Sequence, residues 1–454
     1  MIFFRISAIL NTVKIKNMIK LKPTKSVLLL PAIILGGLLF FGFAKNALAI
    51  DRALIYAPKP DVNVLDQPLT IVGKATIKST VYIWLNDKLQ AKVVVPKAKS
   101  KKATINLFQY TLKKRLNTGN YTLKTQVVNG QEKSDFTEQA FIVPAKWRRK
   151  IDGMMVSTRY WNQLPFGIMI ENTPNARPQS GLGQASIVYE TLAEGGVTRF
   201  LAIFPQSVKP KTVGPVRSSR PYYVDWAKEF DAIYLHAGGS RDALNEIGRL
   251  KVRSFDALTK RAYNFTYRKC SGVHCLYTNK IRLDKLAKQY KLTTANANSD
   301  GWIFKNDEPL AKRQKNAKTI TIDFNGRTYR VDWKYNRKTN RYKRWNGGVI
   351  AKDANTGKQL TASNVLVMRV PKEKVLDRKA RISLQLVGKG SATLYRDGNA
   401  INLQWKKSSS SAKTKFYSKK TGKEIEFNRG TTWIEVVPGT RKVTYKQILR
   451  TLKK

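Results

Sequence analysis

Two histidines and one glutamate are the residues of this chain best suited to acid–base chemistry. The chain has only two histidines: His236 ends an apolar run directly before Ala-Gly-Gly-Ser, and His274 lies in Cys-Ser-Gly-Val-His-Cys at 270–275. Histidine changes its charge near neutral pH, so it can act as acid, base or metal ligand. We therefore predict His236, His274 and Glu194 as catalytic residues, with a structural role for either histidine as the alternative.

Four arginines in the same stretch predict an anion-binding site. The predicted binding residues are Arg177, Arg199, Arg217, Arg220, Ser218, Gly238 and Gly239. Guanidinium groups bind phosphate or carboxylate through two hydrogen bonds, and glycines allow close backbone approach. The segment Gly-Pro-Val-Arg-Ser-Ser-Arg-Pro at 214–221 is loop sequence before a helix start, where anions are also favoured. The alternative is that these arginines form structural ion pairs with nearby acids, namely Glu190, Glu194, Asp225 and Asp231.

Hydrolase and metal chemistry have less support in the sequence. A serine at 218, 219 or 240 could act with His236 and an aspartate, but no Gly-x-Ser-x-Gly motif is present. The two histidines and the scattered acids match no zinc spacing, and a divalent ion with oxygen ligands would leave little trace in the sequence, so we assign no metal site and leave the cofactor unknown. Cys270 and Cys275 are the only cysteines and are expected to form a disulfide, because zinc would need two further ligands.

The predicted site residues occupy turns between short apolar runs. These runs lie at 166–170, 185–189, 198–204 and 232–236, and a helix-capable segment follows at 221–230. Strands that alternate with helices predict an α/β core, in which ligands lie beyond the carboxyl ends of the strands. We assign this central α/β domain to residues 146–295.

Two β-rich regions flank the predicted central domain. Residues 51–145 show alternating strands that end at turn residues such as Asn129-Gly130, which predicts an immunoglobulin-like β-sandwich. Residues 315–445 form a predicted C-terminal β-rich domain, in which Tyr342, Arg344 and Trp345 could contact sugars or acidic polymer or simply pack a sheet. The predicted fold class is therefore multidomain α+β.

Residues 1–50 are predicted to be a signal or anchor segment. A basic stretch without acids precedes an apolar run at 27–44. This pattern predicts a membrane segment with its N-terminus in the cytoplasm, and Ala-Leu-Ala at 47–49 resembles a cleavage site. The expected location is the cell membrane, single-pass with extracytoplasmic domains, or the exterior after cleavage behind Ala49.

The charge of the chain predicts an anionic partner. There are 84 Lys and Arg against 30 Asp and Glu, a formal charge of +54, while 42% of the residues are hydrophobic, which excludes a disordered basic tail. Outside the membrane the available polyanions are cell-wall polymers and lipid headgroups, including lipid-linked substrates. Nucleic acid is the least favoured partner, and a basic surface without any specific partner is the alternative.

Several motifs in order resemble the YerB-like family of bacterial lipoproteins. They are Ile-Glu-Asn at 170–172, Ala-Arg-Pro-Gln-Ser-Gly-Leu at 176–182, Glu-Gly-Gly-Val-Thr-Arg-Phe at 194–200, the segment at 214–221, and His-Ala-Gly-Gly-Ser at 236–240. The resemblance covers about residues 146 to 438 and implies an extracytoplasmic protein with no established reaction. The lipid-attachment cysteine expected of a lipoprotein is absent near the N-terminal segment.

These observations leave three function classes. We predict an exported cell-envelope protein that binds or processes an anionic, phosphate- or carboxylate-bearing substrate at the central domain. The alternatives are a non-catalytic binder of wall polymer and a scaffold that recruits envelope enzymes. The sequence does not decide whether the protein is an enzyme.

Overall fold

The computed structural model describes residues 50–60, 68–98, 100, 103–259, 265–267, 274–293, 297, 301–316, 318–439 and 441–446. The membrane segment predicted at 1–50 lies outside the described residues, apart from Ile50. Within the described ranges, no helix combines the length and apolar character needed to cross a membrane.

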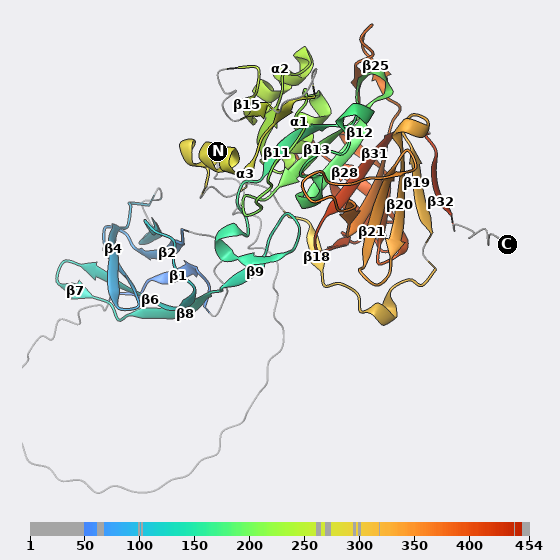
Figure 1. The fold of residues 1–454 in the computed structure, drawn as a ribbon. Helices are drawn as coiled ribbons and strands as arrows, with labels where there is room; N and C mark the ends of the chain where they lie inside the picture. The colour runs from blue at the N-terminus through green and yellow to red at the C-terminus, as the bar shows by residue number, and fades with distance from the viewer. Residues whose placement is uncertain are drawn as a thin grey trace, which may run out of the picture. The chain divides into compact units, whose positions relative to one another are not determined.

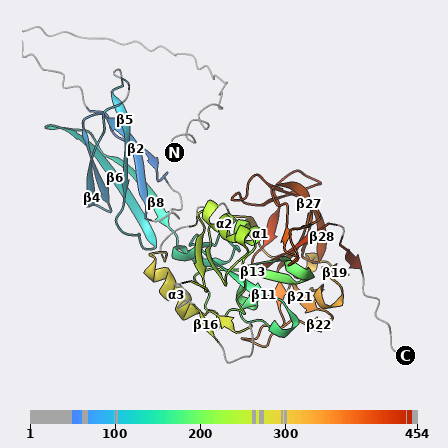
Figure 2. The same ribbon diagram turned by 90° about the horizontal axis from the view of Figure 1, so that it is seen from above.

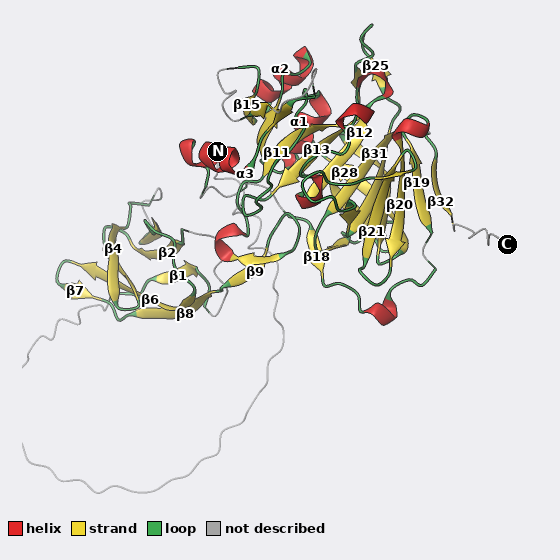
Figure 3. Ribbon diagram, viewed as in Figure 1, coloured by secondary structure: helices red, strands yellow, loops and turns green. Residues whose placement is uncertain are grey.

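The described chain is mostly β-structure, and the predicted α+β class with a central α/β domain is wrong. Its described parts contain three α-helices, α1 (Pro221–Glu229), α2 (Arg241–Arg249) and α3 (Lys280–Gln289) (Figures 1 and 3). The apolar runs do form strands, but Phe166–Glu171 and Ile187–Leu192 both pair antiparallel with Thr198–Phe204. The strand Ile233–His236, which lies between α1 and α2 in the chain, pairs parallel with its neighbours. A strand that is buried on both faces is continuously apolar in either arrangement, so the apolar pattern did not reveal the antiparallel pairs.

Residues 54–143 form two antiparallel sheets around a core of their own (Figure 2). One sheet has the order β1-β2-β5, and the other has the order β4-β3-β6-β7 with β8 beside β6. Along β2 and β3 every second residue is buried, as expected when one face of each sheet covers the core. The strands are β1 (Leu54–Ala57), β2 (Thr70–Thr76), β3 (Thr80–Leu85), β4 (Lys88–Val94), β5 (Ile105–Thr111), β6 (Gly119–Asn129), β7 (Glu132–Lys133) and β8 (Thr137–Val143).

A ten-stranded mixed sheet carries strands from both the predicted central and the predicted C-terminal regions. Strand β12 pairs parallel with β31, from Ile187 opposite Thr432 to Glu190 opposite Glu435, so segments far apart in sequence share one sheet and one core. The domain limits that the sequence predicts, 51–145, 146–295 and 315–445, remain predictions. In spatial order the strands are β15 (Arg253–Asp256), β14 (Ile233–His236), β11 (Phe166–Glu171), β13 (Thr198–Phe204), β12 (Ile187–Leu192), β31 (Thr432–Pro438), β24 (Asn364–Val370), β27 (Gly388–Arg396), β28 (Asn399–Lys407) and β29 (Lys415–Ser418).

A second sheet packs against one face of the ten-stranded sheet. Its strands in spatial order are β22 (Val349–Ile350), β21 (Arg341–Asn346), β20 (Arg330–Asn336), β19 (Thr319–Asp323) and β32 (Val443–Lys446), with β23 (Thr361–Ala362) beside β21. Trp333 of this sheet contacts Trp433 of β31, with ring centroids 5.2 Å apart. On the other face, Trp226 of α1 stacks on Tyr189 of β12 at 4.6 Å. The ten-stranded sheet is therefore covered by a sheet on one side and by a helix on the other.

Four two-stranded pairs complete the described β-structure. They are β9 (Lys146–Arg148) with β10 (Met155–Ser157), β16 (Thr266–Tyr267) with β17 (Leu276–Tyr277), β18 (Ile303–Lys305) with β30 (Glu426–Asn428), and β25 (Lys374–Val375) with β26 (Ile382–Ser383).

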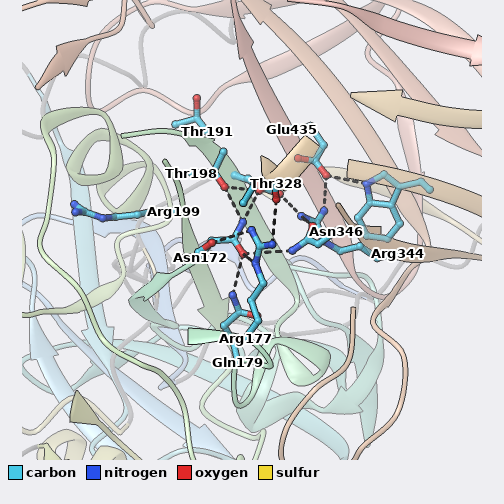
Figure 4. A network of polar contacts seen from close by, with 12 residues as sticks. Asn172, Arg177, Gln179, Thr191, Thr198, Arg199, Thr328, Arg344, Asn346 and Glu435 are labelled. Carbon is cyan, nitrogen blue, oxygen red and sulfur yellow. Dashed lines mark hydrogen bonds and ion pairs between the residues drawn. The ribbon is translucent and has the colours of Figure 1, made fainter. Parts of the chain in front are cut away.

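A buried arginine joins the two packed sheets. Arg344 extends from β21, and its side chain is 0% exposed; its guanidinium lies 2.5 Å from Glu190 of β12 and 2.9 Å from Glu435 of β31 (Figure 4). The rings of Phe200, Trp333 and Trp433 surround the guanidinium. Burial and the neighbouring Glu190 carboxylate raise the pKa of Glu435 well above its usual range. A protonated Glu435 leaves one carboxylate for one guanidinium, so the charge in this core balances.

We expect Arg344→Met to lower the free energy of unfolding by about 3–5 kcal/mol, because Glu190 would remain charged and buried without a partner. By contrast, Glu435→Gln replaces a neutral carboxyl by a neutral amide and should cost about 1 kcal/mol or less. Urea unfolding followed by tryptophan fluorescence measures both values. Arg327→Met, at an exposed arginine, is the control and should change stability by no more than about 0.5 kcal/mol. Equal losses for Arg344→Met and Glu435→Gln would contradict this charge assignment.

Candidate functional site

The predicted site residues gather at one edge of the ten-stranded sheet. Strand β11 runs parallel to β14 and antiparallel to β13, and β12 also runs antiparallel to β13. The carboxyl ends of β11, β12 and β14 therefore meet at the same edge, next to the loop between β13 and α1. This edge is where ligands bind in many open sheets that contain parallel strands.

Backbone pairing brings three distant segments together at this edge. The loop at 213–217 runs along the end of β11, since Glu171 donates its amide proton to Pro215 and Arg217 donates to Met169. On its other side the same loop pairs with the segment that follows His274, through the Val216 amide and the Leu276 carbonyl at 2.7 Å. The side chains of residues 171, 217 and 274 consequently meet.

These three side chains form what we call the Glu171 cluster. Glu171 Oε2 lies 2.6 Å from Arg217 Nε and 2.7 Å from His274 Nδ1, and Glu171 Oε1 accepts from Thr173 at 2.7 Å. The Glu171 side chain is 3% exposed, whereas those of Arg217 and His274 are 20% and 25% exposed. The carboxylate is therefore covered, while the histidine and the arginine that it contacts reach solvent.

The electrostatics of the Glu171 cluster keep the carboxylate charged. Burial alone would raise the pKa of Glu171, but hydrogen bonds from Arg217, Thr173 and His274 outweigh it, so that the pKa is lowered. His274 Nδ1 lies 2.7 Å from Glu171 Oε2 and 3.2 Å from a guanidinium nitrogen of Arg217, so this ring nitrogen is held between an acceptor and a donor. His274 Nε2 makes no hydrogen bond with a described residue, so this nitrogen is open to a ligand.

A second group, the Glu194 cluster, consists of Glu194, Arg199 and Arg220. Arg220 donates to both carboxylate oxygens of Glu194, at 2.9 Å from Nε and 2.6 Å from the second guanidinium nitrogen, and Arg199 pairs with the same carboxylate. Burial would raise the pKa of Glu194, but the two guanidinium groups lower it. Three of the four predicted anion-binding arginines thus already hold a carboxylate of the chain itself, Arg217 on Glu171 and Arg199 and Arg220 on Glu194.

Arg177 is also engaged inside the protein. It donates to the side-chain and main-chain oxygens of Asn172 at 3.0 and 2.9 Å and to the Thr328 carbonyl at 3.1 Å (Figure 4). Asn172 in turn donates to Glu190 and to Thr198, at 3.0 and 2.7 Å. This network continues to Arg344, so Arg177 belongs to the contact between the two sheets.

His236 differs from His274 in its burial and in its contacts. Its side chain is fully buried, it stacks on Tyr234 with centroids 5.0 Å apart, and its ring nitrogens contact the Gly238 carbonyl and the Ser254 hydroxyl, both at 2.7 Å. Burial lowers the pKa of His236. Both ring nitrogens are occupied, which suits a structural role in the turn after β14.

The remaining predicted residues have mixed surroundings. Gly238 donates its amide proton to Asp256 Oδ1 at 2.7 Å, and Gly239 forms a β-bridge with Ser219. Ser218 is half-buried, and its carbonyl accepts from Arg199 at 3.2 Å. Cys275 is buried, and Cys270 lies outside the described residues, so their disulfide stays a prediction. Within the described ranges, no group of three or more His, Cys, Asp or Glu side chains could hold a metal ion.

The central residue of the first cluster, Glu171, is absent from the predicted site. It ends an apolar run and stands in the motif Ile-Glu-Asn at 170–172, where an acid directly after a buried strand was the available signal. Its importance depends on contacts with residues 217 and 274, which sequence spacing does not reveal.

The fold and these motifs place the chain in a family whose function is unknown. The family model "Protein of unknown function (DUF3048) N-terminal domain" matches residues 152–295, and the model of its C-terminal domain matches residues 320–434. The chain belongs to this family, which confirms the resemblance found in its motifs.

One bacterial protein is similar to the chain both in sequence and in crystal structure. The chain is 33% identical over 302 residues to the "Putative lipoprotein YerB" of Bacillus subtilis (strain 168), which covers 64% of this chain and 87% of that protein. The crystal structure of the YerB protein from Bacillus subtilis matches with a TM-score of 0.58 and 30% identity, over 65% of this chain and 99% of that one.

The titration of His236 tests whether its ring is buried. We expect one imidazole, that of His236, to titrate below its usual pKa of about 6.5, because burial disfavours the charged ring. Since the unfolded chain then binds more protons, His236 stabilises the fold above about pH 6.5 and this contribution is lost as the pH falls.

Carbon-edited NMR of histidine-labelled protein measures the midpoint, and the chain offers only two imidazole signals to assign. His274→Asn removes one signal and so assigns the other. A His236 midpoint at or above about 6.5 would be inconsistent with a desolvated ring.

Proposed function

We propose that this chain is an exported envelope protein that binds an anionic, phosphate- or carboxylate-bearing ligand at the Glu171 cluster, where His274 transfers a proton. The observation that carries this proposal is the 2.7 Å contact between Glu171 Oε2 and His274 Nδ1, with the imidazole still a quarter exposed. A buried carboxylate that fixes one nitrogen of a solvent-accessible imidazole is the arrangement used for general acid–base catalysis.

The charges at the sheet edge support an anionic ligand. The Glu171 and Glu194 clusters together contain three arginines and two glutamates, which leaves one net positive charge when His274 is neutral. Protonation of His274 would add a second. All three arginines pair with a glutamate, and we assign ligand contact to Arg217 because its side chain, 20% exposed, is the most exposed of the three.

In this proposal each residue of the two clusters has its own role. Arg217 provides a guanidinium that orients the anion, Glu171 holds the ring of His274, and His274 Nε2 accepts a proton from a bound hydroxyl or water and returns it later. Glu194 is a positioning residue in this scheme, since it fixes Arg220 and Arg199 beside the loop at 217–220.

The envelope location rests on the relative and on composition. The Bacillus subtilis relative carries the name "Putative lipoprotein YerB", and a formal charge of +54 suits an environment of polyanionic wall polymers and lipid headgroups.

The test compares binding with turnover for His274→Asn and Arg217→Gln. Purified chain is titrated with a phosphodiester-linked wall polymer in a calorimeter, and release of phosphomonoester ends is followed on the same samples. We expect His274→Asn to retain binding within about threefold and to lose turnover by about 10²-fold or more, the usual contribution of a general base. Arg217→Gln should weaken binding.

Arg249→Gln is the matched control, because Arg249 is exposed on α2 and pairs only with Glu246 among the contacts of its described neighbours. It should leave both measurements unchanged. Turnover in the His274→Asn variant equal to that of the wild type would refute the acid–base role. Binding without turnover by the wild-type protein would instead favour a non-catalytic binder.

A further inference from the structure

The outer face of the second sheet carries a groove that the proposed site does not use. The groove crosses β32, β19 and β20 and has a volume of about 390 Å³. Its lining residues are Thr319, Thr321, Arg330, Asp332, Lys334, Thr444 and Lys446. Alternation along β19 and β20 puts Ile320, Ile322 and Trp333 into the core, so the groove residues point away from the ten-stranded sheet.

Strand register arranges the polar side chains of this face in a row. Thr319 is opposite Lys446, and Lys334 is opposite Lys343 of the next strand, which in turn pairs with Thr361. Neighbouring strands lie about 4.8 Å apart, so the three lysines are spread over about 15 Å across the strands. We call residues 319, 334, 343 and 446 the lysine row.

The positive charges of the lysine row destabilise the second sheet unless an anion neutralises them. Lys334 and Lys343 are like charges directly across an antiparallel pair, an arrangement that destabilises a sheet. Lys334, Lys343 and Lys446 form no ion pair with any residue in the described ranges. The groove's acid, Asp332, already accepts from Thr321 at 2.6 Å and pairs with Arg330 at 3.3 Å.

The aromatic residue beside the row indicates which ligand chemistry fits. Trp345 lies on the same face of the sheet, but the ammonium group of Lys334 is 4.5 Å from its ring centroid. A ring covered in this way is not an open platform for a sugar, whereas the ammonium groups and the hydroxyls of Thr319 and Thr444 are donors for phosphate oxygens.

We propose that the lysine row binds a linear phosphodiester polymer that crosses the strands. A single phosphate would meet one lysine, but a chain with repeated charges can contact all three at once. This surface is separate from the Glu171 cluster, because Lys343 and Arg344 are consecutive residues on opposite faces of β21 and only Arg344 faces the ten-stranded sheet. The inference therefore does not rest on the proposed function.

The test uses the triple variant Lys334→Gln, Lys343→Gln, Lys446→Gln in the full chain. Its affinity for fluorescently labelled poly(glycerol phosphate) is measured by anisotropy over a range of salt concentrations. We expect a loss of at least tenfold, and a decrease of about two in the slope of log affinity against log salt, since three charge contacts disappear. The control, Lys88→Gln, Lys113→Gln, Lys389→Gln, removes the same charge from exposed positions elsewhere and should stay within twofold.

Three outcomes would overturn the proposal. These are wild-type affinity of the triple variant, an equal loss in the control variant, and equally tight binding of a carboxylate polymer of the same charge density by the wild type. The single variant Lys334→Gln shows whether a loss of affinity is caused by misfolding. Because it removes a like-charge pair, its melting temperature should stay the same or rise, while its affinity should still fall about threefold. The triple variant keeps Arg217 and His274, and Arg217→Gln keeps all three lysines, so a loss of affinity in one variant and not in the other tells which of the two sites has failed.

Discussion

The contact of Arg344 with Glu190 and Glu435 is the interaction on which the rest of the structure depends. It links three strands, β21, β12 and β31, that lie far apart in the sequence. A guanidinium can lie in such a core because two carboxyl groups and an aromatic wall replace its water, and because the raised pKa of Glu435 removes the surplus negative charge. A buried pair of this kind contributes mainly to a unique arrangement of the two sheets, since hydrophobic residues could supply similar stability.

The Arg344 contact is connected to the candidate site by a short hydrogen-bonded path. Glu190 accepts from Asn172, which follows Glu171 directly in the chain. Successive strand residues point to opposite faces, so Asn172 enters the core between the sheets while Glu171 lies on the face that carries α1. The end of β11 is thereby fixed from one side by the core network, and it holds Arg217 and His274 on the other. The rigidity of the Glu171 cluster is therefore a consequence of the packing behind it.

A second fully buried ion pair supports the opposite part of the sheet. Lys407 of β28 contacts Glu229 of α1 at 2.8 Å, and Glu229 also accepts from Tyr189 and from the Thr414 hydroxyl. Here the C-terminal strands again meet residues from the first half of the chain. In a chain with so many surplus cations, acids are scarce, and several of them serve to join the two halves rather than to line the surface.

The sequence by itself determined the family, the positions of most β-strands and the general location of the site. Ordered motifs such as 194–200 and 214–221 are read directly from residue types, and runs of β-branched and aromatic residues indicate strands whatever their partners. The segment at 221–230 likewise has the composition of a helix, and α1 is found there. These features depend on local sequence, which is why they could be predicted.

Only the tertiary structure decided how those pieces combine. Apolar runs do not encode pairing direction, so the shared ten-stranded sheet replaced the predicted α/β arrangement. Ion-pair partners depend on distances between remote segments: Arg199 and Arg220 were equally plausible as ligand contacts or as partners of Glu194, and the fold places them on Glu194. Burial separates His236 from His274, and proximity alone makes Glu171 the residue around which the candidate site is built.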